Sequence, residues 1–155
     1  MPSASSDAGS EQYSIGMAKL KTQKAGGAAN AEVFAWLRAI AEKKAAGLVN
    51  TEDTAQTYTL SATVGAATVE RKGPKAKGTT MPVVYLHEGK AYVSYHLLGL
   101  YKNDSLMKEV SAELSKHMQG QACFNFRKVQ PELSSELGRL TQKSVVALRK
   151  MRYIE

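Results

Sequence analysis

MPVVYLHEGKAYVSYHL, residues 81–97, is the stretch that decides the fold, because it predicts two strands joined by a tight turn. Apolar side chains dominate residues 81–87 and 90–97, and Glu88-Gly89 between them suits a short hairpin connection. Side chains alternate between the two faces of a strand. We therefore expect the alternate apolar residues of the second strand to form its core face: Ala91, Val93, Tyr95 and Leu97.

Other stretches continue this pattern. Residues 57–64 and 121–128 alternate apolar and polar side chains, which is typical of half-buried strands. A weaker strand is expected over residues 65–69. The last strand, in which Phe124 and Phe126 are predicted to point inward, leaves three side chains for its opposite face: Cys123, Asn125 and Arg127.

An amphipathic helix is predicted before the strands, over residues 30–46. Apolar side chains recur there at helical spacing, Asn30 is a good N-cap, and Gly47 suits the position after the helix. Residues 1–29 are rich in small and polar residues, and such a segment buries too little to offset its ordering entropy. We therefore expect a disordered tail over residues 1–29 and one domain over residues 30–155.

Helices also surround the last strand. Two short helices are predicted before it, over residues 104–110 and 112–119, and a long helix begins after it at Pro131. The apolar stripe of the long helix, interrupted by Ser144, consists of Leu133, Leu137, Leu140, Leu148 and Met151. The predicted fold class is α+β: an antiparallel sheet of about four to five strands, covered by the N-terminal helix and the long C-terminal helix, with two short helices inserted before the last strand.

Composition narrows the class of protein further. The chain of 155 residues has one cysteine, Cys123, which excludes an intramolecular disulfide and a paired-cysteine zinc site. A lone thiol suits a reducing compartment. The sequence shows no signal-peptide pattern and no apolar run near the ~20 residues of a spanning helix. We expect a cytoplasmic protein with no membrane partner, and Met1 and Met17 are both open as the start of translation.

The net charge of +7 favours attraction to phosphates or acidic partners. One group of cations lies in a loop predicted over residues 71–80: Arg71, Lys72, Lys75 and Lys77. A second group lies on the predicted final helix: Arg139, Lys143, Arg149, Lys150 and Arg152. A nucleic-acid surface would need both groups on one face, and the sequence leaves this open beside the alternative of solvated charge.

No catalytic constellation emerges. Ser94 and His96 share a strand face, but their spacing of ~6–7 Å is too long for a direct hydrogen bond. No serine lies in the G-x-S-x-G turn of a hydrolase, and Cys123 on a strand is more typical of a buried, inert thiol. The soft metal ligands are not spaced as a pair on one element: His87, His96, His117 and Cys123.

Two segments carry a resemblance to a known family. They are PVVYLHEGKAYVSYHLLGLY at residues 82–101 and SAELSKHMQGQACFNFRKV at residues 111–129. Together they resemble the hallmark segments of the YdhG-like domain family, a strand pair ending in "YVS-aromatic-His-Leu…Tyr" and then "SPEL…MQGK-small-CFNFK". The matching residues of the first segment are Tyr92, Val93, Ser94, Tyr95, His96, Leu97 and Tyr101. Those of the second are Ser111, Glu113, Leu114, Met118, Gln119, Gly120, Cys123, Phe124, Asn125 and Phe126.

The resemblance implies a small α+β domain related in fold to frataxin and to YjbR-like proteins. Most members have no assigned function, and some relatives are described as iron chaperones, so the resemblance raises iron as a cofactor. Frataxin-type iron binding relies on a carboxylate-rich first helix. The predicted first helix here carries Arg38, Lys43 and Lys44 beside two glutamates, and cationic neighbours oppose a hard cation. We therefore expect no bound cofactor.

The matched segments also suggest a site. If the strands that carry them are neighbours, one polar cleft could be lined by Ser94, His96, Tyr101, Gln119, Cys123 and Asn125. These side chains could equally satisfy one another as structure. The sequence thus favours a non-enzymatic module that binds a small ligand, a metal or a protein partner. The alternative is a basic interaction protein that contacts nucleic acid or an acidic partner.

Overall fold

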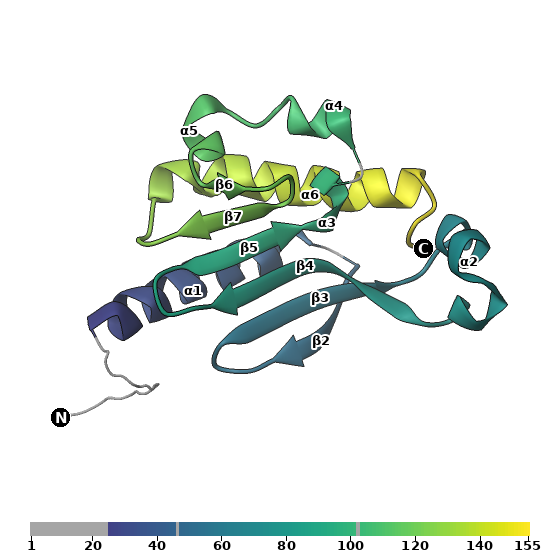
Figure 1. Ribbon diagram of the computed structural model, residues 1–155, viewed down its shortest axis with the longest axis horizontal. Helices are drawn as coiled ribbons and strands as arrows, with labels where there is room; N and C mark the ends of the chain where they lie inside the picture. The colour runs from purple at the N-terminus through teal and green to yellow at the C-terminus, as the bar shows by residue number, and fades with distance from the viewer. Residues whose placement is uncertain (1–24, 46, 102) are drawn as a thin grey trace.

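The computed structural model describes residues 25–45, 47–101 and 103–155, and it has the predicted α+β class (Figure 1). The helices are α1 (Ala25–Lys44), α2 (Ala66–Lys72), α3 (Leu98–Tyr101), α4 (Asp104–Met107), α5 (Ala112–Ser115) and α6 (Ser134–Lys150), with short 3₁₀ turns η1 (Pro74–Ala76) and η2 (Pro131–Leu133). The strands are β2 (Val49–Asp53), β3 (Thr57–Thr63), β4 (Thr80–Glu88), β5 (Val93–Leu97), β6 (Met118–Gln119) and β7 (Cys123–Phe126).

Six strands of the described residues form one sheet in the order β2-β3-β4-β5-β7-β6, and every neighbouring pair is antiparallel. The sheet has more strands than the predicted four to five because both edge strands lack a sequence signal. Strand β2 is exposed along its whole length and polar after Val49, and β6 has only two residues. Neither strand therefore alternates apolar and polar side chains in the way that marks a half-buried strand.

The core lies between one face of the sheet and the two long helices, α1 and α6, which contact each other on that face (Figure 1). Tyr95 on β5 is fully buried, and its hydroxyl lies 2.7 Å from the Thr141 hydroxyl on α6. The Trp36 indole on α1 packs edge-on against Phe126, with 5.2 Å between ring centroids. The predicted inward positions of β5 and β7 are thus confirmed, except that Ala91 lies before β5 and is exposed.

The first helix begins five residues earlier than predicted, at Ala25, so Asn30 is not its N-cap. Asn30 is buried, and its side-chain amide donates hydrogen bonds of 3.0 Å to the carbonyls of Gly89 and Lys90. An amide that can cap a helix can also satisfy carbonyls of a distant loop, and the sequence does not distinguish these roles. Residues 1–24 of the predicted tail lie outside the described residues.

Three local predictions are wrong: the strand over residues 65–69, the loop over residues 71–80 and the two-residue hairpin turn. Residues 65–69 do not form a strand: the short helix α2 begins at Ala66, and its start is bonded to the C-terminal segment, with the Ala67 amide 2.9 Å from the Arg152 carbonyl. The predicted basic loop is correspondingly the end of α2 followed by η1. The hairpin turn is also longer than Glu88-Gly89, because Glu88 pairs with Val93 inside the ladder. Its connection is residues 89–92.

The segment before β7 holds three short helices among its described residues, α3, α4 and α5, where two were predicted. The Asn103 side chain caps α4 and the Ser111 hydroxyl caps α5. Helix α5 ends at Ser115, and the predicted continuation to Gln119 is instead β6. Glu136 on α6 accepts hydrogen bonds from the Ser111 amide and hydroxyl at 2.8 and 2.7 Å, which ties the inserted segment to the last helix.

Helix α6 begins at Ser134, after the 3₁₀ turn η2, rather than at the predicted Pro131. Four residues of the predicted apolar stripe are buried in the core, Leu133, Leu137, Leu140 and Leu148, whereas Met151 is only partly buried. Ser144 within the stripe has a packing role. Ser144 is fully buried, and a Cβ on Gly99 of α3 would meet its hydroxyl, with the Ser144 carbonyl oxygen at 2.7 Å. Two small residues therefore let α3 lie directly against α6.

No helix within residues 25–45, 47–101 and 103–155 is long and apolar enough to cross a membrane.

Candidate functional site

Five of the six predicted cleft residues lie together on three neighbouring strands. In the ladder between β5 and β7, Ser94 pairs with Asn125 and His96 pairs with Cys123. In the ladder between β6 and β7, Gln119 pairs with Cys123. Paired residues of an antiparallel ladder share a face of the sheet. We call this group the polar row: Ser94, His96, Gln119, Cys123 and Asn125.

Hydrogen bonds link the polar row through Asn125. The Ser94 hydroxyl donates to Asn125 Oδ1 at 2.8 Å, and the Cys123 thiol donates to the same oxygen at 3.3 Å. Asn125 Nδ2 donates to Gln119 Oε1 at 2.6 Å. On the other side of the thiol, Cys123 Sγ lies 3.5 Å from His96 Nε2. These hydrogen bonds fix the orientations of the side chains relative to one another.

The polar row lies on the face of the sheet opposite to α1 and α6, which we call the open face. Its strand neighbours Phe124, Phe126 and Tyr95 are fully buried on the core face, whereas Ser94, His96, Cys123 and Asn125 are half-buried and Gln119 is exposed. A strand covered by helices on one side presents its alternate residues on the other. The polar row is thus accessible on a rigid support.

Sequence reasoning missed Tyr85 on β4 as an aromatic neighbour of the polar row, and it did not include His87 of the same strand in the cleft. Tyr85 pairs with His96, and their ring centroids are 5.5 Å apart. His87 pairs with Ser94 and stacks on Tyr85 with 6.4 Å between ring centroids. The register of the hairpin was the signal that could have found them, but that register depends on the length of the turn, which was predicted too short.

The environment keeps the two titratable members of the polar row uncharged. Burial lowers the pKa of His96 below its ordinary value, and the nearby His87 lowers it further. Burial also raises the pKa of the Cys123 thiol, against a smaller opposite effect of the hydrogen bond with Ser94. A catalytic cysteine needs the reverse, a thiolate stabilised by a cationic partner. At neutral pH this pair is a thiol beside a neutral imidazole.

Tyr101 is the predicted cleft residue that lies on a different element from the rest. Strand β5 ends at Leu97 and the chain turns into α3, so Tyr101 lies on that helix with 60% of its surface exposed. The sequence predicted no helix directly after this strand.

The polar row contains two soft metal ligands, Cys123 Sγ and His96 Nε2. A structural metal site needs about four ligands and a catalytic site three. Among the described residues there is no group of three or more histidine, cysteine, aspartate and glutamate side chains that could hold a metal ion.

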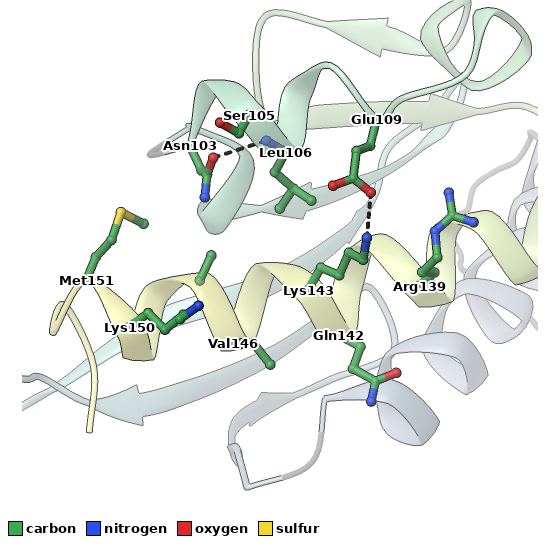
Figure 2. Close-up of a pocket in the computed structure, with 11 residues that line it drawn as sticks. Asn103, Ser105, Leu106, Glu109, Arg139, Gln142, Lys143, Val146, Lys150 and Met151 are labelled. Atoms are coloured by element: carbon green, nitrogen blue, oxygen red, sulfur yellow. Dashed lines mark hydrogen bonds and ion pairs between the residues drawn. The ribbon is translucent and has the colours of Figure 1, made fainter.

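The two basic groups occupy different elements. All four members of the first group, Arg71, Lys72, Lys75 and Lys77, are exposed on α2 and around η1. Three members of the second group, Arg139, Lys143 and Lys150, line a cavity of about 650 Å³ between α4 and α6 (Figure 2). Arg149 lines a second cavity of about 210 Å³ beside the end of α1. Arg152 lies after α6, where its carbonyl contacts α2.

Comparisons of this chain with family models, curated proteins and solved structures found no match. The resemblance to the YdhG-like family stays a prediction from the two quoted segments.

Proposed function

We propose that this chain is a non-enzymatic binding module that holds a small, uncharged polar ligand over the polar row. The observation that carries the proposal is the linked set of hydrogen bonds from Ser94 through Asn125 to Gln119 on the open face. A sheet face devoted only to solvation does not need fixed amides and an imidazole in one group. Binding sites, in contrast, use a few convergent polar groups on a rigid support.

The charge state of the site indicates the ligand class. The pKa shifts of His96 and Cys123 both favour their neutral forms, and the other three members of the polar row carry no charge. The rings of Tyr85 and His96 add planar surface beside these donors and acceptors. A neutral planar compound with amide or hydroxyl groups would match this surface, because it could exchange hydrogen bonds without the desolvation of a charge.

Small-molecule titration followed by amide NMR tests the proposal. We expect the neutral planar probes nicotinamide and uracil to shift amide signals of β4, β5 and β7 at concentrations of about 1 mM or below. The variant His96→Ala should lose the shifts, and Ser135→Ala, an exposed change on α6, should keep them. The absence of shifts with both probes, or shifts that survive His96→Ala, would contradict the proposal.

The same titration distinguishes binding of a metal ion from binding of an organic compound. Zn²⁺ and Fe²⁺ serve as probes, because Cys123 and His96 supply two soft ligands 3.5 Å apart. We expect weak binding at most, since two protein ligands leave most of the coordination shell to water. Tight metal binding that depends on Cys123 and His96 would show that the site holds a metal ion rather than a neutral organic compound.

A further inference from the structure

A groove runs between α4 and α6, away from the polar row. Its volume is about 650 Å³. Its walls come from Asn103, Ser105, Leu106 and Glu109 on one side and from α6 with Met151 on the other (Figure 2). We call it the α4–α6 groove. Cavities of this size are large enough for a ligand to make specific contacts.

The groove is basic. Three cations line it, Arg139, Lys143 and Lys150, against one carboxylate, Glu109. Figure 2 shows Lys143 reaching across the groove to Glu109, and the two side chains form an ion pair of 2.6 Å. Arg139 and Lys150 lie on either side of Lys143 along α6, and no ion pair within the described parts of the chain involves them. Their charges are available to a partner.

The groove is also apolar between its cations. Val146 is one of the few large apolar residues exposed in the described structure, at 50% of its surface. Leu106, Ala147 and Met151 line the same groove. An exposed aliphatic side chain in a groove bordered by charges is typical of an interaction surface rather than of simple solvation.

The spacing of these residues matches a helix as the occupant. Arg139, Lys143, Val146 and Lys150 follow one another at steps of four, three and four residues, so they form one stripe along α6. Arg139 and Lys150 are 11 residues apart, or roughly 16 Å at the helical rise per residue. A segment of three helical turns would reach both cations and cover Val146 between them.

We propose that the α4–α6 groove docks an amphipathic helix of a protein partner, with acidic residues opposite Arg139 and Lys150 and apolar residues opposite Val146. Helix-in-groove binding uses this combination of an apolar centre and a charged rim. Among the residues that line the groove none is aromatic, so it lacks the stacking surfaces with which single-stranded nucleic acid is bound. A small anion would use one end of the groove and leave the other cation and the apolar surface unused.

Fluorescence anisotropy with a designed peptide tests the proposal. The probe is a fluorescein-labelled peptide of about 15 residues, with glutamates spaced to face Arg139 and Lys150 and leucines along the same side. The control probe has lysine in place of each glutamate. We expect the acidic peptide to bind and the basic peptide not to bind, with affinity that falls as salt rises because exposed charges are screened.

Two variants with the same change in net charge locate the binding. R139E/K150E should weaken binding of the acidic peptide at least about tenfold. R71E/K75E, which reverses two exposed cations of the first basic group, should leave the affinity within about twofold. Val146→Asp should also weaken binding, and circular dichroism of each variant checks that the fold is kept.

Each of the following results supports or overturns the proposal that the α4–α6 groove docks a helix. Amide NMR shifts confined to α4 and α6 on addition of the acidic peptide would support the groove as its site. The proposal is overturned if no binding occurs up to about 1 mM peptide, or if R71E/K75E weakens binding as much as R139E/K150E. It is also overturned if a DNA duplex or an anionic lipid vesicle binds more tightly and loses that binding in R139E/K150E. None of these outcomes depends on the polar row.

Discussion

At the scale of single residues, the chemistry of the polar row depends on what burial does to Cys123 and His96. Burial raises the pKa of the thiol and lowers the pKa of the imidazole, so both side chains resist ionisation near neutral pH. A thiolate–imidazolium pair would require both shifts to be reversed. The close approach of the two side chains, 3.5 Å, is therefore a contact between neutral groups.

Thiol labelling tests this account of Cys123. We expect a disulfide reagent to modify Cys123 at pH 7 at least about tenfold more slowly than it modifies a free cysteine, because the thiolate is the reacting form. Ser94→Ala should slow the reaction further, since the hydrogen bond with Ser94 lowers the pKa of the thiol. His96→Ala should leave the rate equal or higher. A clear decrease in His96→Ala would instead show that the imidazole activates the thiol.

The sequence predicted most of the polar row because strand alternation is a local property. His96 and Asn125 were each placed on the polar face of a strand, and the ladder between β5 and β7 brings these faces together. Tyr101 was grouped with them because it follows the same strand in the matched segment, but β5 ends at Leu97 and α3 carries Tyr101. Tyr85 was missed because cross-strand neighbours depend on a register that a single residue in the turn can change.

At the scale of elements, the contact between α3 and α6 depends on two small side chains. Gly99 faces Ser144 so closely that an added Cβ would lie 2.7 Å from the Ser144 carbonyl oxygen. The Ser144 hydroxyl is fully buried and has no hydrogen-bond partner within the described structure. A buried hydroxyl without a partner costs stability, so this serine is tolerated for its size rather than for its polarity.

Substitutions at this contact should change stability in opposite directions. Gly99→Ala should lower the free energy of unfolding by roughly 1–3 kcal/mol, because a backbone carbonyl cannot move aside as a flexible side chain can. Ser144→Ala should be neutral or raise it by up to about 1 kcal/mol, since it removes an unsatisfied hydroxyl. Urea unfolding of both variants measures the two effects. A destabilised Ser144→Ala would mean that the hydroxyl has a partner.

Element boundaries were harder to predict than element types, for reasons that these cases make clear. The helix α1 was predicted from its apolar spacing, but its start was placed at Asn30, whose side chain in fact satisfies carbonyls of the β4–β5 connection. Residues 65–69 read as a weak strand, and their helical form is fixed by contacts with the C-terminal segment at Tyr153 and Arg152. Such tertiary contacts between distant residues leave no local pattern.

At the scale of the whole molecule, the arrangement of layers followed from the sequence because it depends on periodicity. Two long amphipathic helices and several alternating strands allow few ways to bury their apolar faces, and a sheet covered on one side is among them. The edge strands β2 and β6 were not predicted, because they contribute almost nothing to the core. The α4–α6 groove was not predicted either, because it forms only when the inserted helices lie against α6.

The stability of the whole fold should carry two opposing dependences on pH. Burial raises the pKa of Glu88 from 4.5 to about 7, so between these values the folded state binds the proton more tightly and stability falls as pH rises. The pKa of His96 is shifted below 6.5, so below that value the unfolded state takes up the proton first and stability rises with pH. Just below pH 6.5, where both groups titrate, the two contributions partly cancel.

Single substitutions should separate these contributions. Glu88→Gln should raise the free energy of unfolding at pH 8 by roughly 2–3 kcal/mol and by much less at pH 5, because glutamine cannot ionise in the buried position. The stability of the Glu88→Gln variant should then rise with pH up to about 6.5, because only the His96 contribution remains. His96→Gln should show the reverse slope, a stability that falls steadily from pH 5 to pH 7. Urea unfolding across this range measures all three proteins, and parallel pH profiles would exclude these two groups as the cause.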